Sequence, residues 1–170
     1  GSRIVNANTF GASAHKLTGS AYTLEQVITA GIENCKRACA PYGALTALDV
    51  GPLGELLEPS GTLAFEDAVA EYARIVKAGE AAGADLIFFE TYTDLYELKA
   101  ALLAAKENTH LPILASMSFE AGGRTFTGCT VESFGVTARG LGANAVGINC
   151  SLGPKEIFPM AKRLAEAVPG

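Results

Sequence analysis

Two reactive side chains stand where apolar runs of the sequence end. Glu90 directly follows the run at residues 86–89, and Cys150 follows the run at residues 145–149. A carboxylate in such a place suits a substrate ammonium group, and a thiolate binds soft metals such as zinc or meets an electrophile. Plain structural interpretations stay open for both: Glu90 can cap the next helix or pair with a lysine, and Cys150 can act as a small apolar residue.

The other cysteines and the histidines show no spacing typical of a catalytic or metal site. Cys35 and Cys39 lie four residues apart on the apolar stripe of an expected helix, so core packing explains them better than a shared metal. Cys129 has no His or Lys beside it to act as a base. Neither His15 nor His110 stands beside a nucleophile. Scattered cysteines do not make a disulfide framework in a chain of this length, so we expect reduced thiols.

The charge and the composition exclude several classes of function. The net charge is −5, and no run of Lys or Arg alternates with aromatic residues, so nucleic acid is not an expected partner. No apolar run approaches the roughly 18 residues that a membrane span requires, and the first residues lack the pattern of a signal peptide. With 49% hydrophobic and 18% charged residues, the composition is that of a folded protein. We expect a cytoplasmic protein.

Short apolar runs alternate with longer segments of helical period along the chain, which is typical of a parallel α/β fold. Strands are expected at residues 3–9, 45–50, 85–91, 112–119 and 143–149. Helices are expected at residues 23–40, 62–83, 94–106, 130–141 and 155–168. Because parallel strands all end at one edge of a sheet, Glu90 and Cys150 are expected at the same edge.

This alternation is compatible with an open doubly wound sheet or with part of a closed eight-stranded barrel. No Gly-x-Gly-x-x-Gly turn follows the first expected strand, and no phosphate-binding loop occurs elsewhere, which disfavours a nucleotide-binding sheet. A barrel of this kind needs eight β/α units. Since the chain supplies about five, the barrel would be partial, with unpaired edge strands.

Several segments at or near the expected strand ends give the chain a resemblance to a known family. Taken together, they resemble the zinc-dependent homocysteine S-methyltransferases, and most closely the homocysteine-binding domain found in cobalamin-dependent methionine synthases. In order along the chain, the segments are NTFGA at 8–12, DVGPLG at 49–54, LEP at 57–59, FET at 89–91, SMSF at 116–119, Gly128, and GINCSLGP at 147–154.

The resemblance implies a (β/α)8 TIM barrel in which the five expected strands correspond to strands 2 to 6 of eight. Residues 1–170 are then a homocysteine methyltransferase barrel domain that is incomplete at both ends. Cys150 is implied to be one of three cysteine ligands of a zinc ion, with the other two outside this chain. Glu90 is implied to bind the substrate amino group, and Asn8 and Asn149 are implied to line the same site.

The implied reaction transfers a methyl group to the zinc-activated thiolate of homocysteine and forms methionine. The implied donor is methylcobalamin, held by a cobalamin-binding module of a parent protein that also carries a folate-binding module. Three alternatives stay open. The donor can be betaine or S-methylmethionine, the chain can be a truncated barrel that is zinc-free and inactive alone, or it can belong to an unrelated β/α enzyme with Glu90 as a general base.

Overall fold

The computed structural model describes residues 1–169, in which strands and helices alternate. Each observed strand overlaps a predicted one. The largest difference is in the first strand, which ends at Asn6 instead of residue 9 because the chain turns there: the Thr9 amide donates to the Ala7 carbonyl at 2.9 Å. The strands are β1 (Ile4–Asn6), β2 (Leu45–Val50), β3 (Leu86–Tyr92), β4 (Ile113–Met117) and β5 (Ala145–Ile148).

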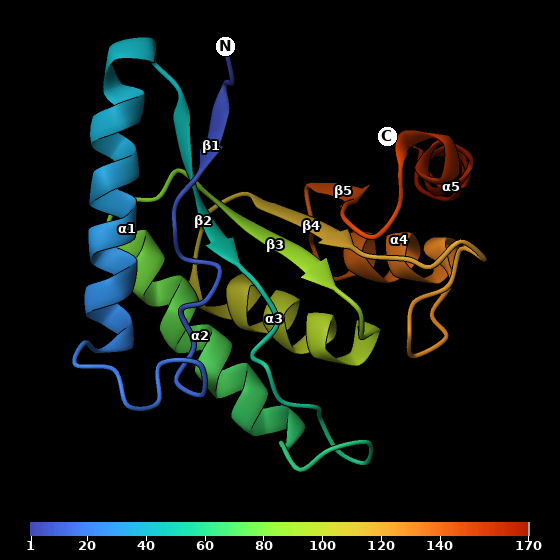
Figure 1. Ribbon diagram of the computed structural model, residues 1–170, viewed down its shortest axis with the longest axis horizontal. Helices are drawn as coiled ribbons and strands as arrows, with labels where there is room; N and C mark the ends of the chain where they lie inside the picture. Colours follow the sequence, from blue (N-terminus) through green and yellow to red (C-terminus); the bar gives the residue numbers. More distant parts are fainter. Residues whose placement is uncertain (170) are drawn as a thin grey trace.

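The strands form one sheet in the order β1-β2-β3-β4-β5, and every neighbouring pair is parallel. An open doubly wound sheet reverses its strand order at a switch point, whereas this order follows the sequence without a reversal. Figure 1 shows the helices arranged around the outside of the curved sheet. The predicted fold class is confirmed: an α/β fold that forms part of a (β/α)8 barrel.

Helices α1, α3 and α4 begin at side-chain caps that the sequence supplies. The side chains of Thr23, Asp94 and Thr130 each accept a hydrogen bond from a backbone amide in the first turn of the helix that follows. No helix in residues 1–169 is long and apolar enough to cross a membrane. The helices are α1 (Leu24–Cys39), the 3-10 turn η1 (Ala40–Tyr42), α2 (Phe65–Ala81), α3 (Leu95–Asn108), α4 (Val131–Gly140) and α5 (Pro154–Ala167).

The core lies between the helices and one face of the sheet. Helix α2 approaches β2 so closely that a Cβ atom on Gly79 would come within 2.4 Å of the Leu48 side chain, so a larger residue there would force Leu48 to move. Phe89 of β3 is fully buried on the same face. Cys35 and Cys39 are also buried in this core, with their sulfur atoms 3.8 Å apart, which confirms the prediction that they are packing residues.

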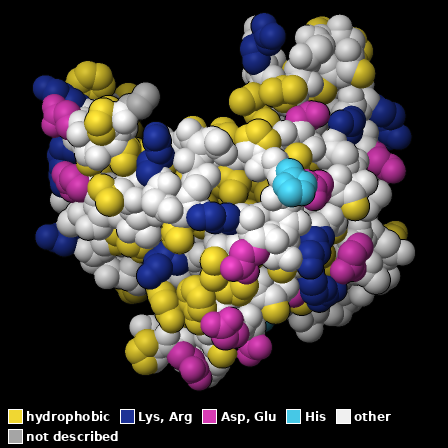
Figure 2. Space-filling model, turned by 180° about the vertical axis from the view of Figure 1, so that it is seen from behind, with side chains coloured by type: hydrophobic (Ala, Val, Ile, Leu, Met, Phe, Trp, Pro, Cys, Tyr) yellow, Lys and Arg dark blue, Asp and Glu magenta, His cyan; other side chains and the backbone are white. Residues whose placement is uncertain are grey.

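The other face of the sheet is open. Ile4 and Leu45, paired on β1 and β2, leave 42% and 47% of their surface exposed although both are large apolar residues. The space-filling view shows a hollow between two projecting ends of the molecule, with hydrophobic side chains inside it (Figure 2). The open face therefore combines an apolar floor with the polar residues described next.

Candidate functional site

Polar side chains from four strands and from the residue after β5 lie across the open face, near the carboxyl ends of the strands. Asn6 pairs with the residue two before Asp49, and the partner of Asp49 lies two residues before Glu90. Ser116 pairs with the residue two before Asn149. Residues two apart on a strand point to the same face, so these side chains share one face. We call Asn6, Asp49, Glu90, Ser116 and Asn149 the polar row.

Asn149 connects the far side of the polar row to its centre. Its Nδ2 donates to Glu90 Oε2 at 3.1 Å and to Thr91 Oγ1 at 2.6 Å. Its Oδ1 accepts from Ser116 Oγ at 2.8 Å and from the Thr91 amide at 3.2 Å. Because both ends of the amide are bonded, the orientation of Asn149 is fixed, and Glu90 receives a donor from it.

Asp49 is the most deeply buried acid of the row, with 7% of its surface exposed. Its Oδ2 accepts a long hydrogen bond of 3.4 Å from Asn6 Nδ2, while its Oδ1 is buried and receives no donor from the described residues. Burial raises the pKa of Asp49 to about 7, and repulsion by Glu90 and a hydrogen bond between the two carboxyl groups add to the rise.

Cys150 stands beside the row on an unusual backbone. The side chain is exposed, and its Sγ lies 3.4 Å from Asn149 Nδ2 and 3.6 Å from Thr91 Oγ1. Thr91 (φ 64°), Cys150 (φ 58°) and Ser151 (φ 60°) all have left-handed backbones, which are rare for residues other than glycine. Backbone strain of this kind concentrates at functional sites, so its position beside a thiol marks a candidate site.

The chain as a whole matches one protein family. The sequence model of the homocysteine S-methyltransferase family matches residues 1–169. The chain belongs to this family. Methionine synthase of Mycobacterium tuberculosis is 32% identical over 88 residues, which make up 49% of this chain and 7% of that protein. Methionine synthase of Mycobacterium leprae is 29% identical over 89 residues, with the same shares. The chain thus spans only a small part of the curated relatives it matches.

Solved structures of homocysteine methyltransferases share the fold. The metallated form of the homocysteine methyltransferase MmuM from Escherichia coli superposes with a TM-score of 0.85 at 19% identity, covering 99% of this chain and 64% of that one. The apo form of the same enzyme gives a TM-score of 0.78 at 20% identity, covering 99% and 63%. At such identities the likeness establishes the fold, a β/α barrel, and the family match establishes membership of the homocysteine S-methyltransferase family.

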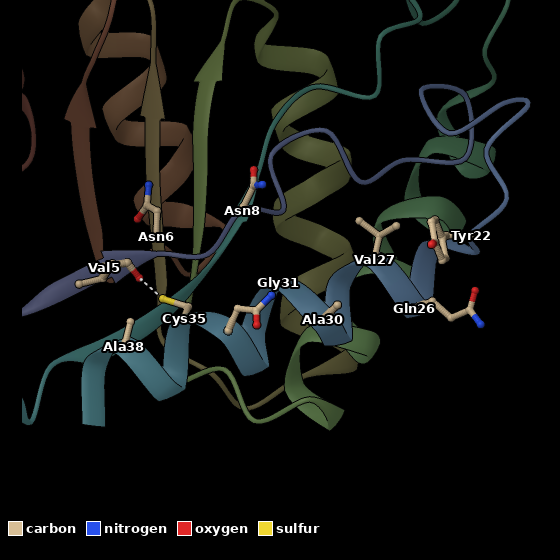
Figure 3. Close-up of a pocket in the computed structure, with 11 residues that line it drawn as sticks. Val5, Asn6, Asn8, Tyr22, Gln26, Val27, Ala30, Gly31, Cys35 and Ala38 are labelled. Carbon is tan, nitrogen blue, oxygen red and sulfur yellow. Dashed lines mark hydrogen bonds between the residues drawn. The ribbon is translucent and has the colours of Figure 1, made fainter. Parts of the chain in front are cut away.

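The structure of this homocysteine S-methyltransferase chain brings three of the four predicted site residues together. Glu90, Asn149 and Cys150 meet through the Asn149 amide. Asn8 lies apart: its side chain is exposed, and no hydrogen bond joins it to the polar row in residues 1–169. It follows β1 beside a cavity of about 490 Å³ between β1 and α1, where Figure 3 shows Asn6 and Asn8 pointing away from α1.

The sequence interpretation gave no role in the site to Asp49 and Ser116. Each lies inside a mostly apolar run of the sequence, which does not show what its side chain faces. Thr91 directly follows Glu90, but threonine favours extended strands, so its left-handed conformation has no sequence signal. The one available signal was the two-residue period of side chains along a strand. By this period Asp49 shares the open face with Glu90, and Ser116 shares it with Asn149.

Family membership raises the question of whether these residues fit a zinc ion. Within residues 1–169 no group of three or more His, Cys, Asp or Glu side chains is arranged to hold a metal. Cys150 offers one exposed thiol, and structural or catalytic zinc takes at least three protein ligands. The described residues therefore fit one corner of a zinc site and not a complete one.

Proposed function

We propose that this chain binds L-homocysteine for an enzyme that transfers a methyl group to the homocysteine thiol and forms methionine. The observation that carries the proposal is the Asn149 amide, which lies 3.1 Å from the Glu90 carboxylate and 3.4 Å from the Cys150 sulfur. Homocysteine carries an ammonium group and a thiol on one short molecule. The Asn149 side chain holds an acid, Glu90, and a thiol-binding position, Cys150. The acid suits the ammonium group of homocysteine, and the thiol-binding position suits its thiol.

The residues of the site have separate roles in this proposal. Glu90 receives the substrate ammonium group, because a carboxylate can accept several hydrogen bonds and Asn149 supplies one of them here. Asn149, held by Ser116 and Thr91, keeps Glu90 in place. Asn8 lines the mouth of the same site beyond the end of β1. These side chains bind and orient the substrate, which brings its sulfur to the Cys150 side.

Cys150 is proposed as one ligand of a zinc ion, with the remaining ligands from residues other than those described. Zinc bound by thiolates lowers the pKa of a coordinated thiol and holds it as the nucleophilic thiolate. The Asn149 amide and the Thr91 hydroxyl contact the Cys150 sulfur and suit a thiolate, because both groups can donate a hydrogen bond to it. Since one ligand is not a zinc site, we assign activity to the complete protein.

The donor and the wider setting follow from the relatives. The similarity to two mycobacterial methionine synthases, of which this chain covers only 7%, supports a parent protein with further modules. We propose methylcobalamin as the donor, held by a cobalamin-binding module that a folate-binding module recharges. We further propose that residues 1–170 belong to one barrel domain and that the protein works in the cytoplasm, where a thiol substrate stays reduced.

The test is the zinc content and the methyl transfer activity of the complete protein and of two cysteine variants. Cys150→Ser removes the proposed ligand, and Cys129→Ser makes the same change at a half-buried thiol whose sulfur lies beside the Thr130 carbonyl. We expect Cys150→Ser to lose zinc and more than about 100-fold of its activity, since even residues that only support metal ligands contribute about 10- to 100-fold. Cys129→Ser keeps both.

Methionine formation is measured with methylcobalamin, betaine and S-methylmethionine as separate donors. Activity with methylcobalamin alone supports the methionine synthase assignment, and activity with one of the small donors replaces it by another member of the family. A Cys150→Ser protein with full zinc content and full activity would overturn the role of Cys150.

A further inference from the structure

One buried acid of the open face has no role in the proposed function so far. Asp49 is more than nine-tenths buried, and its Oδ1 receives no hydrogen bond donor from the described residues. An unpaired buried carboxylate lowers the stability of the folded protein, so it is kept only where another interaction offsets this loss. The Glu90 carboxyl group lies on the neighbouring strand, two residues beyond the partner of Asp49, and its charge is one cause of the raised pKa of Asp49.

No ion pair neutralises these two acids among the described residues. Neither Asp49 nor Glu90 forms a salt bridge within residues 1–169. The groups that contact the pair, Asn6 and Asn149, are neutral amides. Two carboxylates in contact repel each other unless a proton lies between them, and burial places that proton on Asp49, the more enclosed of the two.

We infer that Asp49 is a positioning residue for the substrate ammonium site: its protonated carboxyl group donates a hydrogen bond to Glu90 and fixes the carboxylate that receives the ammonium. The inference rests on the proposed function, because it takes Glu90 as the ammonium acceptor. It adds a second donor to Glu90. Asp49 donates from β2, and Asn149 donates from the residue that follows β5.

The backbone of Asp49 is held for this role. The Thr9 hydroxyl donates to the Asp49 carbonyl at 2.8 Å and accepts from the Asp49 amide at 3.1 Å. Thr9 is itself buried against α1, where a Cβ atom on Gly31 would come within 2.7 Å of its methyl group. The segment after β1 thus fixes Asp49, Asp49 fixes Glu90, and the ammonium position follows.

Two substitutions of Asp49 distinguish a role as a hydrogen bond donor from a role as a negative charge. Asp49→Asn keeps a hydrogen bond donor in the same place without a charge, and Asp49→Leu has a similar size but no donor. If Asp49 donates to Glu90, asparagine replaces it and leucine does not. If the negative charge of Asp49 attracts the ammonium group, both substitutions weaken binding equally.

The experiment measures the dissociation constants of L-homocysteine and of 4-mercaptobutanoate, which is homocysteine without its amino group, by calorimetry on the complete protein. Asp67→Asn, an exposed acid in the first turn of α2, is the control for loss of one charge. We expect Asp49→Leu to bind homocysteine about 10-fold more weakly or worse, which is the usual effect of losing a hydrogen bond to a charged group. Asp49→Asn and Asp67→Asn stay within about threefold of the unaltered protein.

Binding of 4-mercaptobutanoate separates positioning from misfolding, because it does not use the ammonium site. We expect all the variants to bind it equally. The inference is overturned if Asp49→Leu retains homocysteine affinity, if Asp49→Asn loses as much as Asp49→Leu, or if Asp49→Leu weakens both ligands alike. An unaltered protein that prefers homocysteine yet forms no methionine refutes the methyl transfer and leaves the inference standing, whereas one that binds neither ligand refutes both.

Discussion

Two buried acids on opposite faces of the same sheet differ in what surrounds them. Glu97 of α3, with 5% of its surface exposed, lies on the face that the helices cover. Its Oε1 accepts from the Leu53 amide at 2.7 Å and from the Tyr72 hydroxyl at 2.9 Å. Asp49, with 7% exposed, lies on the open face, where one oxygen has a single donor at 3.4 Å and the other has none.

The comparison separates a structural acid from a functional one. Burial raises the pKa of Glu97, and the hydrogen bonds from Leu53 and Tyr72 work against that rise, since they stabilise the charged form. Those donors tie the loop after β2 to α2 and α3, so Glu97 is satisfied within the fold. Asp49 instead faces another acid. Burial of an acid does not by itself indicate a functional site. A buried acid indicates a functional site when the fold provides no hydrogen bond donor for it.

The largest effect is expected from Glu97→Ala. The substitution leaves the Leu53 amide and the Tyr72 hydroxyl without their acceptor and opens a cavity between α2 and α3, so we expect the free energy of unfolding to fall by about 3 kcal/mol. Urea unfolding measures it. Glu97→Gln keeps an acceptor oxygen and should cost about 1 kcal/mol. A Glu97→Ala protein as stable as the unaltered one would show that Glu97 is not a structural acid.

A smaller effect of opposite sign is expected from Asp49→Asn. Asp49 ionises near pH 7 when folded and near its usual 3.8 when unfolded, so between these values the folded chain binds more protons and stability falls as the pH rises. Asparagine does not titrate. The variant should therefore match the unaltered protein near pH 4 and exceed it by about 1–2 kcal/mol at pH 8.

Urea titrations at several pH values test this prediction, with Asp67→Asn as the control that gains nothing with pH. An Asp49→Asn protein that is less stable than the unaltered chain at pH 8 would mean that the Asp49 carboxylate finds a donor after all. Asp49 would then belong with Glu97 as a structural acid.

The fold was predictable because its signals are local. Apolar runs and helical periods recur over whole segments, and caps such as Thr23 and Asp94 stand beside the helices they begin. The first strand was predicted too long because residues 7–9 are as suitable for a strand as those before them, and only the turn at Thr9, made in three dimensions, ends it. The consecutive strand order was not in the sequence pattern, which left an open sheet possible.

The site was predictable only where a reactive residue stands at the end of an apolar run of the sequence. Glu90, Asn149 and Cys150 do so, and their shared edge follows from parallel pairing. Asp49 was not found, because its importance comes from facing Glu90, and this depends on the register between β2 and β3. The resemblance to the family supplied the roles of the strand-end residues, whereas the missing donor at Asp49 became visible only in the structure.

The smallest effect concerns backbone strain, which also distinguishes the two faces. The non-glycine residues with left-handed backbones in residues 1–169 are Thr91, Cys150 and Ser151, all beside the polar row. Ser151→Gly should relieve one of these positions and raise the melting temperature by about 1–4 °C, because glycine adopts this backbone freely at a modest entropic cost. Ser60→Gly, at an exposed loop residue without a left-handed backbone, should give no gain in melting temperature.

If the strain holds the Cys150 thiol toward Asn149, the stabilised Ser151→Gly protein should also transfer methyl groups more slowly. A gain in both stability and rate would show that the strain has no function.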